Sequence, residues 1–66
     1  MRITINDNCL EMPEGTTLEE ALSIAGIKPT GIATAVNDTV IARDKRNTHK
    51  LSDGDKILII KAFYGG

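Results

Sequence analysis

The sequence contains one segment with clear helical periodicity, and this single helix limits the folds that a chain of 66 residues can adopt. Four apolar residues follow the spacing i, i+3, i+4 and i+7, which places their side chains on one helical face. They are Leu18, Ala21, Leu22 and Ala25. A helix with one apolar face must bury it against another element. The sequence therefore predicts one helix over residues 17–25, packed on a sheet.

Both ends of this helix carry recognisable signals. Two overlapping pairs have the spacing of a capping box: Thr17 with Glu20, and Thr16 with Glu19. Gly26 fits the left-handed position that often ends a helix, and an apolar residue follows it, as is common there.

The remaining patterned segments are rich in β-branched residues or alternate between polar and apolar, which predicts strands. They cover residues 2–6, 9–12, 32–37, 39–42 and 56–63. The pair Asp7 and Asn8 predicts the turn of a first hairpin, and Asn37 and Asp38 predict a second turn.

Residues 43–47, "RDKRN", predict a solvated polar connection, with a docking patch for an acidic partner as the alternative. Leu51 is the one residue expected to anchor this connection in the core. "SDGD" at 52–55 predicts a turn rather than a cation site, because the remaining ligands of a calcium loop are missing.

In the last predicted strand the central residues are apolar at both odd and even positions, so both faces of the strand are apolar. This pattern suits an interior strand covered on both faces, or a strand whose second face meets a partner. The order of the elements predicts an α+β fold of the β-grasp (ubiquitin-like) type. We expect a mixed sheet of four to five strands, covered on one face by one main helix. Residues 1–66 are expected to form one domain, with 63–66 as a flexible functional tail.

Composition narrows the possible partners. The net charge of −1 gives no basic footprint for nucleic acid. The longest apolar run, at 57–60, is far shorter than the roughly 20 residues that span a bilayer. The first residues lack the apolar core of a signal peptide. We therefore expect a cytoplasmic protein that binds neither nucleic acid nor membrane.

Few residues offer catalytic chemistry. The chain has one histidine, His49, and one cysteine, Cys9, so a zinc site built from cysteine and histidine is not expected. His49 lies in a polar connection and Cys9 begins a strand, which favours structural roles for both. A persulfide on Cys9 would require an exposed thiol of lowered pKa.

The sequence ends on Gly65 and Gly66 directly after the last strand. Glycine has no Cβ, so its backbone can thread a narrow channel. A terminal carboxylate is an anion at neutral pH and a poor electrophile. Transfer of AMP from ATP would turn it into a mixed anhydride, and a sulfur nucleophile could then displace AMP and leave a thiocarboxylate. This chemistry needs a reachable terminus on the carrier and no catalytic residue of its own.

Several stretches together resemble the ThiS family, the ubiquitin-like sulfur carrier proteins of thiamine biosynthesis. They are "VND" at 36–38, "VIARD" at 40–44, "LSDGDKILII" at 51–60 and the final Gly65-Gly66. The resemblance covers the whole chain. Tyr64 departs from the family pattern, in which many members have a small or aliphatic residue.

The resemblance implies a carrier with no permanently bound cofactor, whose Gly66 carboxylate is adenylated by a ubiquitin-activating-like adenylyltransferase that uses ATP. It implies conversion to a thiocarboxylate, with sulfur from a donor linked to a cysteine desulfurase, and transfer to the thiazole ring on thiazole synthase. Gly65 would allow the tail to thread into the partners. The residues expected to dock on partners are Leu58, Ile60, Phe63 and Tyr64.

Four alternatives remain open at this point. The small subunit of molybdopterin synthase shares the terminal chemistry but its members are usually longer, and other carriers serve cysteine synthesis or tRNA thiolation. A non-covalent β-grasp adaptor would not need its terminal glycines. A ubiquitin-like modifier would instead be attached to lysines.

Overall fold

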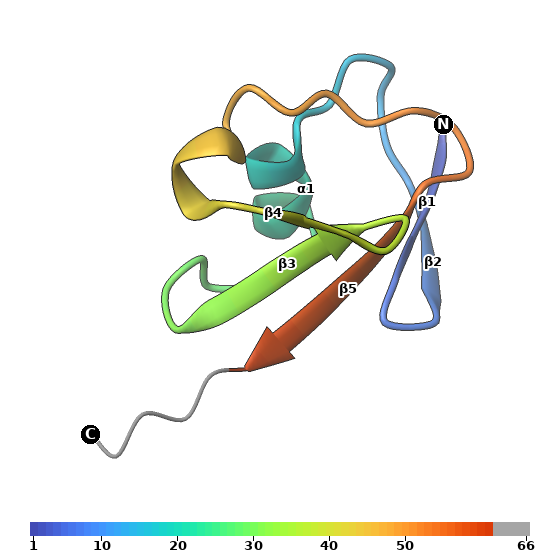
Figure 1. The fold of residues 1–66 in the computed structure, drawn as a ribbon. Helices are drawn as coiled ribbons and strands as arrows, with labels where there is room; N and C mark the ends of the chain where they lie inside the picture. Colours follow the sequence, from blue (N-terminus) through green and yellow to red (C-terminus); the bar gives the residue numbers. More distant parts are fainter. Residues whose placement is uncertain (62–66) are drawn as a thin grey trace.

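The computed structural model describes residues 1–61, and its elements are one helix, one short 3₁₀ helix and five strands (Figure 1). The strands are β1 (Arg2–Ile5), β2 (Asn8–Glu11), β3 (Ile32–Val36), β4 (Thr39–Ile41) and β5 (Lys56–Lys61). The helix α1 spans Leu18–Ile24, and the 3₁₀ helix η1 spans Arg43–Lys45.

The five strands form one mixed sheet in the order β2-β1-β5-β3-β4. Strand β5 lies in the middle, parallel to β1 and antiparallel to β3. The two outer pairs, β1 with β2 and β3 with β4, are antiparallel hairpins. Helix α1 lies against one face of this sheet (Figure 1). The predicted β-grasp fold is confirmed, with five strands in the sheet.

The first hairpin turns one residue earlier than the sequence pattern predicted. Asn6 and Asp7 occupy the turn with φ of 45° and 71°, and Asn8 already belongs to β2. The second turn lies where it was predicted, with Asn37 at 49° and Asp38 at 70°. Two consecutive residues at positive φ define the two-residue hairpin turn that matches the twist of the strands. Asparagine and aspartate tolerate this conformation better than other residues with a side chain.

Helix α1 confirms the first of the two predicted capping pairs. The Thr17 hydroxyl accepts from the Glu20 amide at 3.2 Å, and the Glu20 carboxylate accepts from the Thr17 amide at 2.9 Å. The hydroxyl of Thr16 instead donates to the Pro13 carbonyl. At the other end Gly26 has φ of 73° and ends the helix as predicted.

The core lies between α1 and the inner face of the sheet. It contains Ile3, Ile5, Met12, Leu18, Ala21, Val36, Leu51 and Ile57. Three of the four residues on the predicted helical face are buried, and Ala25 packs at the margin of the core. The predicted anchor, Leu51, is buried as expected.

The connection over residues 43–47 is not the fully solvated segment that its polarity predicted. Its first three residues form η1 and are exposed, but Arg46 is only 2% exposed. The guanidinium finds hydrogen-bond acceptors inside the fold, which compensate for the loss of water around a buried charge. Arg46 therefore cannot belong to the alternative docking patch for an acidic partner, because the Arg46 side chain points into the protein.

The apolar residues of β5 suited either a strand covered on both faces or a strand whose second face meets a partner, and the structure decides between these options. Ile57 is buried under α1, whereas Leu58 and Ile60 are 51% and 55% exposed. Within residues 1–61 no element covers their face, so β5 is central in the sheet but covered on one face only. The predicted extension of this strand through Ala62 and Phe63 lies outside the described residues. No helix among residues 1–61 is long and apolar enough to cross a membrane.

Candidate functional site: the outer face of the sheet

Apolar side chains gather on the sheet face that α1 leaves uncovered. Residues directly opposite each other on neighbouring strands share a face. Leu58 lies opposite Ala35, which lies opposite Val40, and Ile60 lies opposite Ala33. We call these five residues the outer apolar face. Its large side chains are Val40, Leu58 and Ile60, all at least half exposed.

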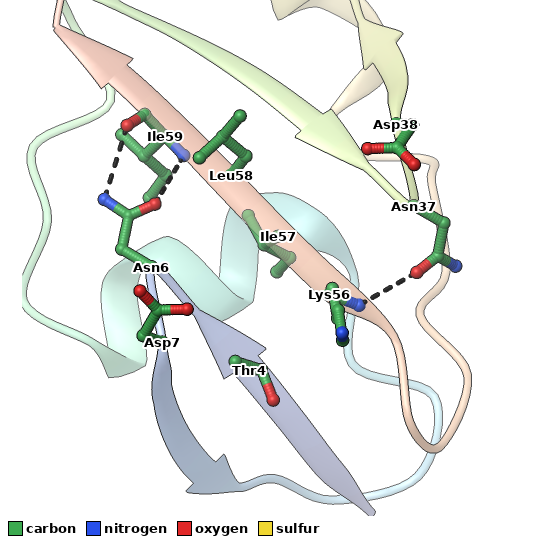
Figure 2. A pocket seen from close by; sticks show the side chains of 9 residues that line it. All are labelled: Thr4, Asn6, Asp7, Asn37, Asp38, Lys56, Ile57, Leu58 and Ile59. Carbon is green, nitrogen blue, oxygen red and sulfur yellow. Dashed lines mark hydrogen bonds between the residues drawn. The ribbon is translucent and has the colours of Figure 1, made fainter.

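Asn6 fixes one flank of β5 beside this face. Its side-chain oxygen accepts from the Ile59 amide at 2.9 Å, and its side-chain nitrogen donates to the Ile59 carbonyl at 3.3 Å (Figure 2). Its own amide donates to the Ile57 carbonyl at 3.1 Å. The side chain therefore continues the ladder between β1 and β5 after β1 itself has ended.

Asn37 acts in the same way on the other flank. Its side-chain oxygen accepts from the Lys56 amide at 3.0 Å, and its own amide donates to the Lys56 carbonyl at 2.9 Å (Figure 2). Its side-chain nitrogen donates to the Asp55 carboxylate at 2.9 Å. The two hairpin turns thus hold β5 from both sides, Asn37 at the first residue of the strand and Asn6 further along it.

A shallow hollow lies over β5 between the two turns. Its lining residues are Thr4, Asn6, Asp7, Asn37, Asp38, Lys56, Ile57, Leu58 and Ile59 (Figure 2). Leu58 belongs to the outer apolar face and also lines this hollow, so the two surfaces are continuous. Charged side chains from both turns and from the start of β5 stand at its margin. An apolar surface with a polar rim is the usual composition of a protein–protein contact.

The predicted docking residues fall into two groups. Leu58 and Ile60 lie together on the outer apolar face, two residues apart on one strand. Phe63 and Tyr64 lie outside the described residues, as do the predicted reactive residues Gly65 and Gly66. The predicted flexible tail over 63–66 also falls there. Lys61, the last described residue, ends β5.

Cys9 and His49 do not come together. Cys9 is an exposed free cysteine on β2, at one edge of the sheet. His49 lines a hollow with β4, at the opposite edge. A pair of these residues acting on one substrate is therefore ruled out by their positions.

The segment "SDGD" forms a turn, as predicted. The Asp53 carboxylate accepts from the Arg2 amide at 2.7 Å, and the Asp55 carboxylate accepts from the Ser52 amide at 2.8 Å. Both carboxylates are thus used to hold the turn and the first strand. In the part of the chain that the structure describes, no group of three or more metal-ligating side chains occurs.

Sequence reasoning missed the two asparagine side chains and Arg46. Asn37 was predicted only as a turn former and Asn6 only as the end of the first strand. Nothing in the local pattern shows that their side chains bond to a strand far away in the sequence. Arg46 sits in a run of charged residues, and its neighbours Arg43 and Lys45 are exposed as that run predicts.

Comparison with known proteins gives the fold and its surface a family context. The model of the ThiS family matches residues 2–66. The chain belongs to the ThiS family. It is 32% identical to the sulfur carrier protein ThiS of Escherichia coli (strain K12) over 66 residues, which is the full length of both chains.

Two solved structures share the fold. The crystal structure of the thiamine biosynthesis protein ThiS of Geobacter metallireducens has a TM-score of 0.81 at 23% identity, covering all of this chain and 99% of that one. The solution structure of a thiamine biosynthesis protein from the same organism has a TM-score of 0.76 at 22% identity, covering all of this chain and 88% of that one. Both confirm the ThiS architecture of the sheet and helix.

Proposed function

We propose that this chain is a sulfur carrier protein of thiamine biosynthesis. The observation that carries the proposal is the match to the sulfur carrier ThiS of Escherichia coli along the full length of both chains. The fold supports it, because a small sheet whose apolar outer face is exposed among residues 1–61 is suited to docking on larger enzymes.

The proposed reactive group is the carboxylate of Gly66. An activating enzyme transfers AMP from ATP to this carboxylate and releases pyrophosphate. Hydrosulfide supplied by the sulfur donor then attacks the carbonyl carbon, the bond from this carbon to the phosphate oxygen breaks and AMP leaves with the electron pair, and loss of the S–H proton gives the thiocarboxylate. Gly65 keeps the backbone beside it slender enough to enter an active site. The support for both residues is the sequence, since they lie outside residues 1–61.

The proposed docking surface is the outer apolar face. Leu58 and Ile60 would supply the apolar centre of the contact, and the polar hollow over β5 its rim. Phe63 and Tyr64 are proposed to extend it, on the sequence alone. The partners would be a ubiquitin-activating-like adenylyltransferase, thiazole synthase, and a sulfur donor linked to a cysteine desulfurase.

In this scheme the chain is a protein cosubstrate and not a catalyst. ATP would be bound by the activating enzyme, and no cofactor would reside on the carrier. We place the protein in the cytoplasm, because its activation consumes ATP.

A growth experiment tests the pathway. Deletion of the gene in the organism from which it comes is expected to create a thiamine requirement that supplied thiazole satisfies. The unaltered gene should restore growth, whereas a version with one alanine added after Gly66 should not, because the reactive carboxylate then lies on another residue. A requirement relieved by molybdenum cofactor and not by thiazole would contradict the thiamine assignment.

A further inference from the structure

Arg46 is a buried cation that the proposed sulfur chemistry does not use. Its guanidinium donates to three acceptors: the Thr34 hydroxyl at 3.1 Å, the Pro29 carbonyl at 2.8 Å and the Ile32 carbonyl at 2.8 Å. Among residues 1–61 no carboxylate forms an ion pair with it. The burial of its charge is therefore compensated by two peptide dipoles and a hydroxyl, which must stay in place for the side chain to remain inside.

The acceptors lie in the loop before β3 and in the first residues of β3. The backbone of Arg46 adds a second attachment, because its carbonyl accepts from the Glu19 amide at 3.1 Å in the first turn of α1. Arg46 thus connects the helix to the start of β3 through one residue.

The start of β3 is the strand segment against which the end of β5 lies. Ile32 lies opposite Lys61, and Ala33 lies opposite Ile60. On the side of β5 that faces β1, the end of the strand has no paired strand. β1 pairs with β5 only as far as Ile57, and the side chain of Asn6 bonds only as far as Ile59. The last two residues of β5 therefore depend on β3 alone.

We propose that Arg46 is a positioning residue for the sulfur-carrier terminus. By holding the Pro29 and Ile32 carbonyls it fixes the start of β3, and through β3 it fixes the end of β5, from which the C-terminal residues begin. The inference rests on the proposed function only for its consequence in sulfur chemistry. The positioning itself is a property of the fold and can be measured without any partner.

Amide hydrogen exchange measures the positioning. Because the Ile59 amide faces Asn6, the alternation along a strand directs the Leu58 and Ile60 amides toward β3. In the R46K variant, which keeps the charge but loses the planar fork, exchange at Ile60 is expected to accelerate by about tenfold more than at Leu58. That factor corresponds to the loss of roughly one charge-assisted hydrogen bond.

Two variants at Thr34 give a second measurement that does not change the arginine. Thr34→Val removes the hydroxyl that accepts from Arg46 and is expected to accelerate exchange at Ile60 in the same selective way. Thr34→Ser keeps the hydroxyl and serves as its matched control. Ile3→Val, a core substitution in β1, controls for a general loss of stability and should accelerate Leu58 and Ile60 by the same factor.

Steady-state kinetics with the activating enzyme then separate positioning from docking. R46K replaces no residue of the outer apolar face, and Leu58 keeps its pairing with Ala35, so the KM for the carrier is expected to stay within about twofold. The terminus is presented less accurately, so kcat is expected to fall by about tenfold, because small misplacements of reacting groups have effects of this size or larger.

The outcomes separate the two proposals. Equal acceleration at Leu58 and Ile60 in both R46K and Thr34→Val would overturn the positioning role, as would unchanged exchange at both amides. A raised KM with unchanged kcat would overturn its consequence for the chemistry. Exchange could accelerate selectively at Ile60 in the two variants while the activating enzyme fails to modify the wild-type chain. That result would support the positioning role and contradict the proposed function.

Discussion

Two asparagines show how one residue type serves both a turn and a strand. Asn6 and Asn37 each begin a hairpin turn at positive φ, and each directs its side chain onto the backbone of β5. A side-chain amide carries a donor and an acceptor, as a peptide group does, so it can continue a ladder where the backbone has turned away. The turn geometry and the central strand are thereby fixed by the same side chains.

Replacement of Asn6 by glycine tests this double role. Glycine accepts the positive φ but loses both bonds to Ile59, so the free energy of unfolding is expected to fall by about 1–2 kcal/mol. Urea denaturation measures the change. Asp7→Gly is the matched control in the same turn, and it should leave the stability unchanged or raise it slightly, because glycine relieves the strain of positive φ. Equal losses in both variants would show that the turn, and not the bonds to Ile59, supplies the stabilisation.

Strand β5 is the element that connects core and surface. Its buried Ile57 packs on the inner face, while Leu58 and Ile60 emerge on the outer face, as the period of two requires. One helix covers one face of the sheet, and among the described residues the other face has no cover. An exposed apolar patch of this kind typically marks an interaction site.

Leu58→Thr tests the docking role of this face. Threonine is β-branched, which suits a strand, and it removes much of the apolar surface of leucine. Its apparent affinity for the activating enzyme is expected to fall by about tenfold or more, as for a central residue of an interface. The free energy of unfolding should change by less than about 1 kcal/mol, since the side chain is half exposed.

Ile24→Thr is the matched control for this substitution. Ile24 is 52% exposed, nearly the same as Leu58, but lies on α1. Titration of each variant with the activating enzyme, followed by calorimetry, compares the two positions. An equal loss of affinity in both, or no loss at Leu58, would contradict docking through the outer apolar face.

The sequence left open whether the second face of the last strand is covered. At the scale of the whole molecule, it predicted the element order and the β-grasp fold. These features follow from local periodicity and from having one helix for two sheet faces. The first turn was predicted one residue late, because asparagine and aspartate suit either position. The bond between Asn6 and Ile59 crosses 53 positions and helps to fix the register. Arg46 was missed for the same reason, since its acceptors lie 12 to 17 positions away.

The central claim is that the chain carries sulfur on its terminal carboxylate, and mass spectrometry tests it most directly. The protein is incubated with ATP, its activating enzyme and a sulfur donor, and is then cleaved after Lys61 to release residues 62–66. We predict that one oxygen of this peptide is replaced by sulfur, and that Cys9→Ser does not prevent the change. An unmodified peptide from enzymes shown to be active on their own carrier, or sulfur found on Cys9 instead, would contradict the account.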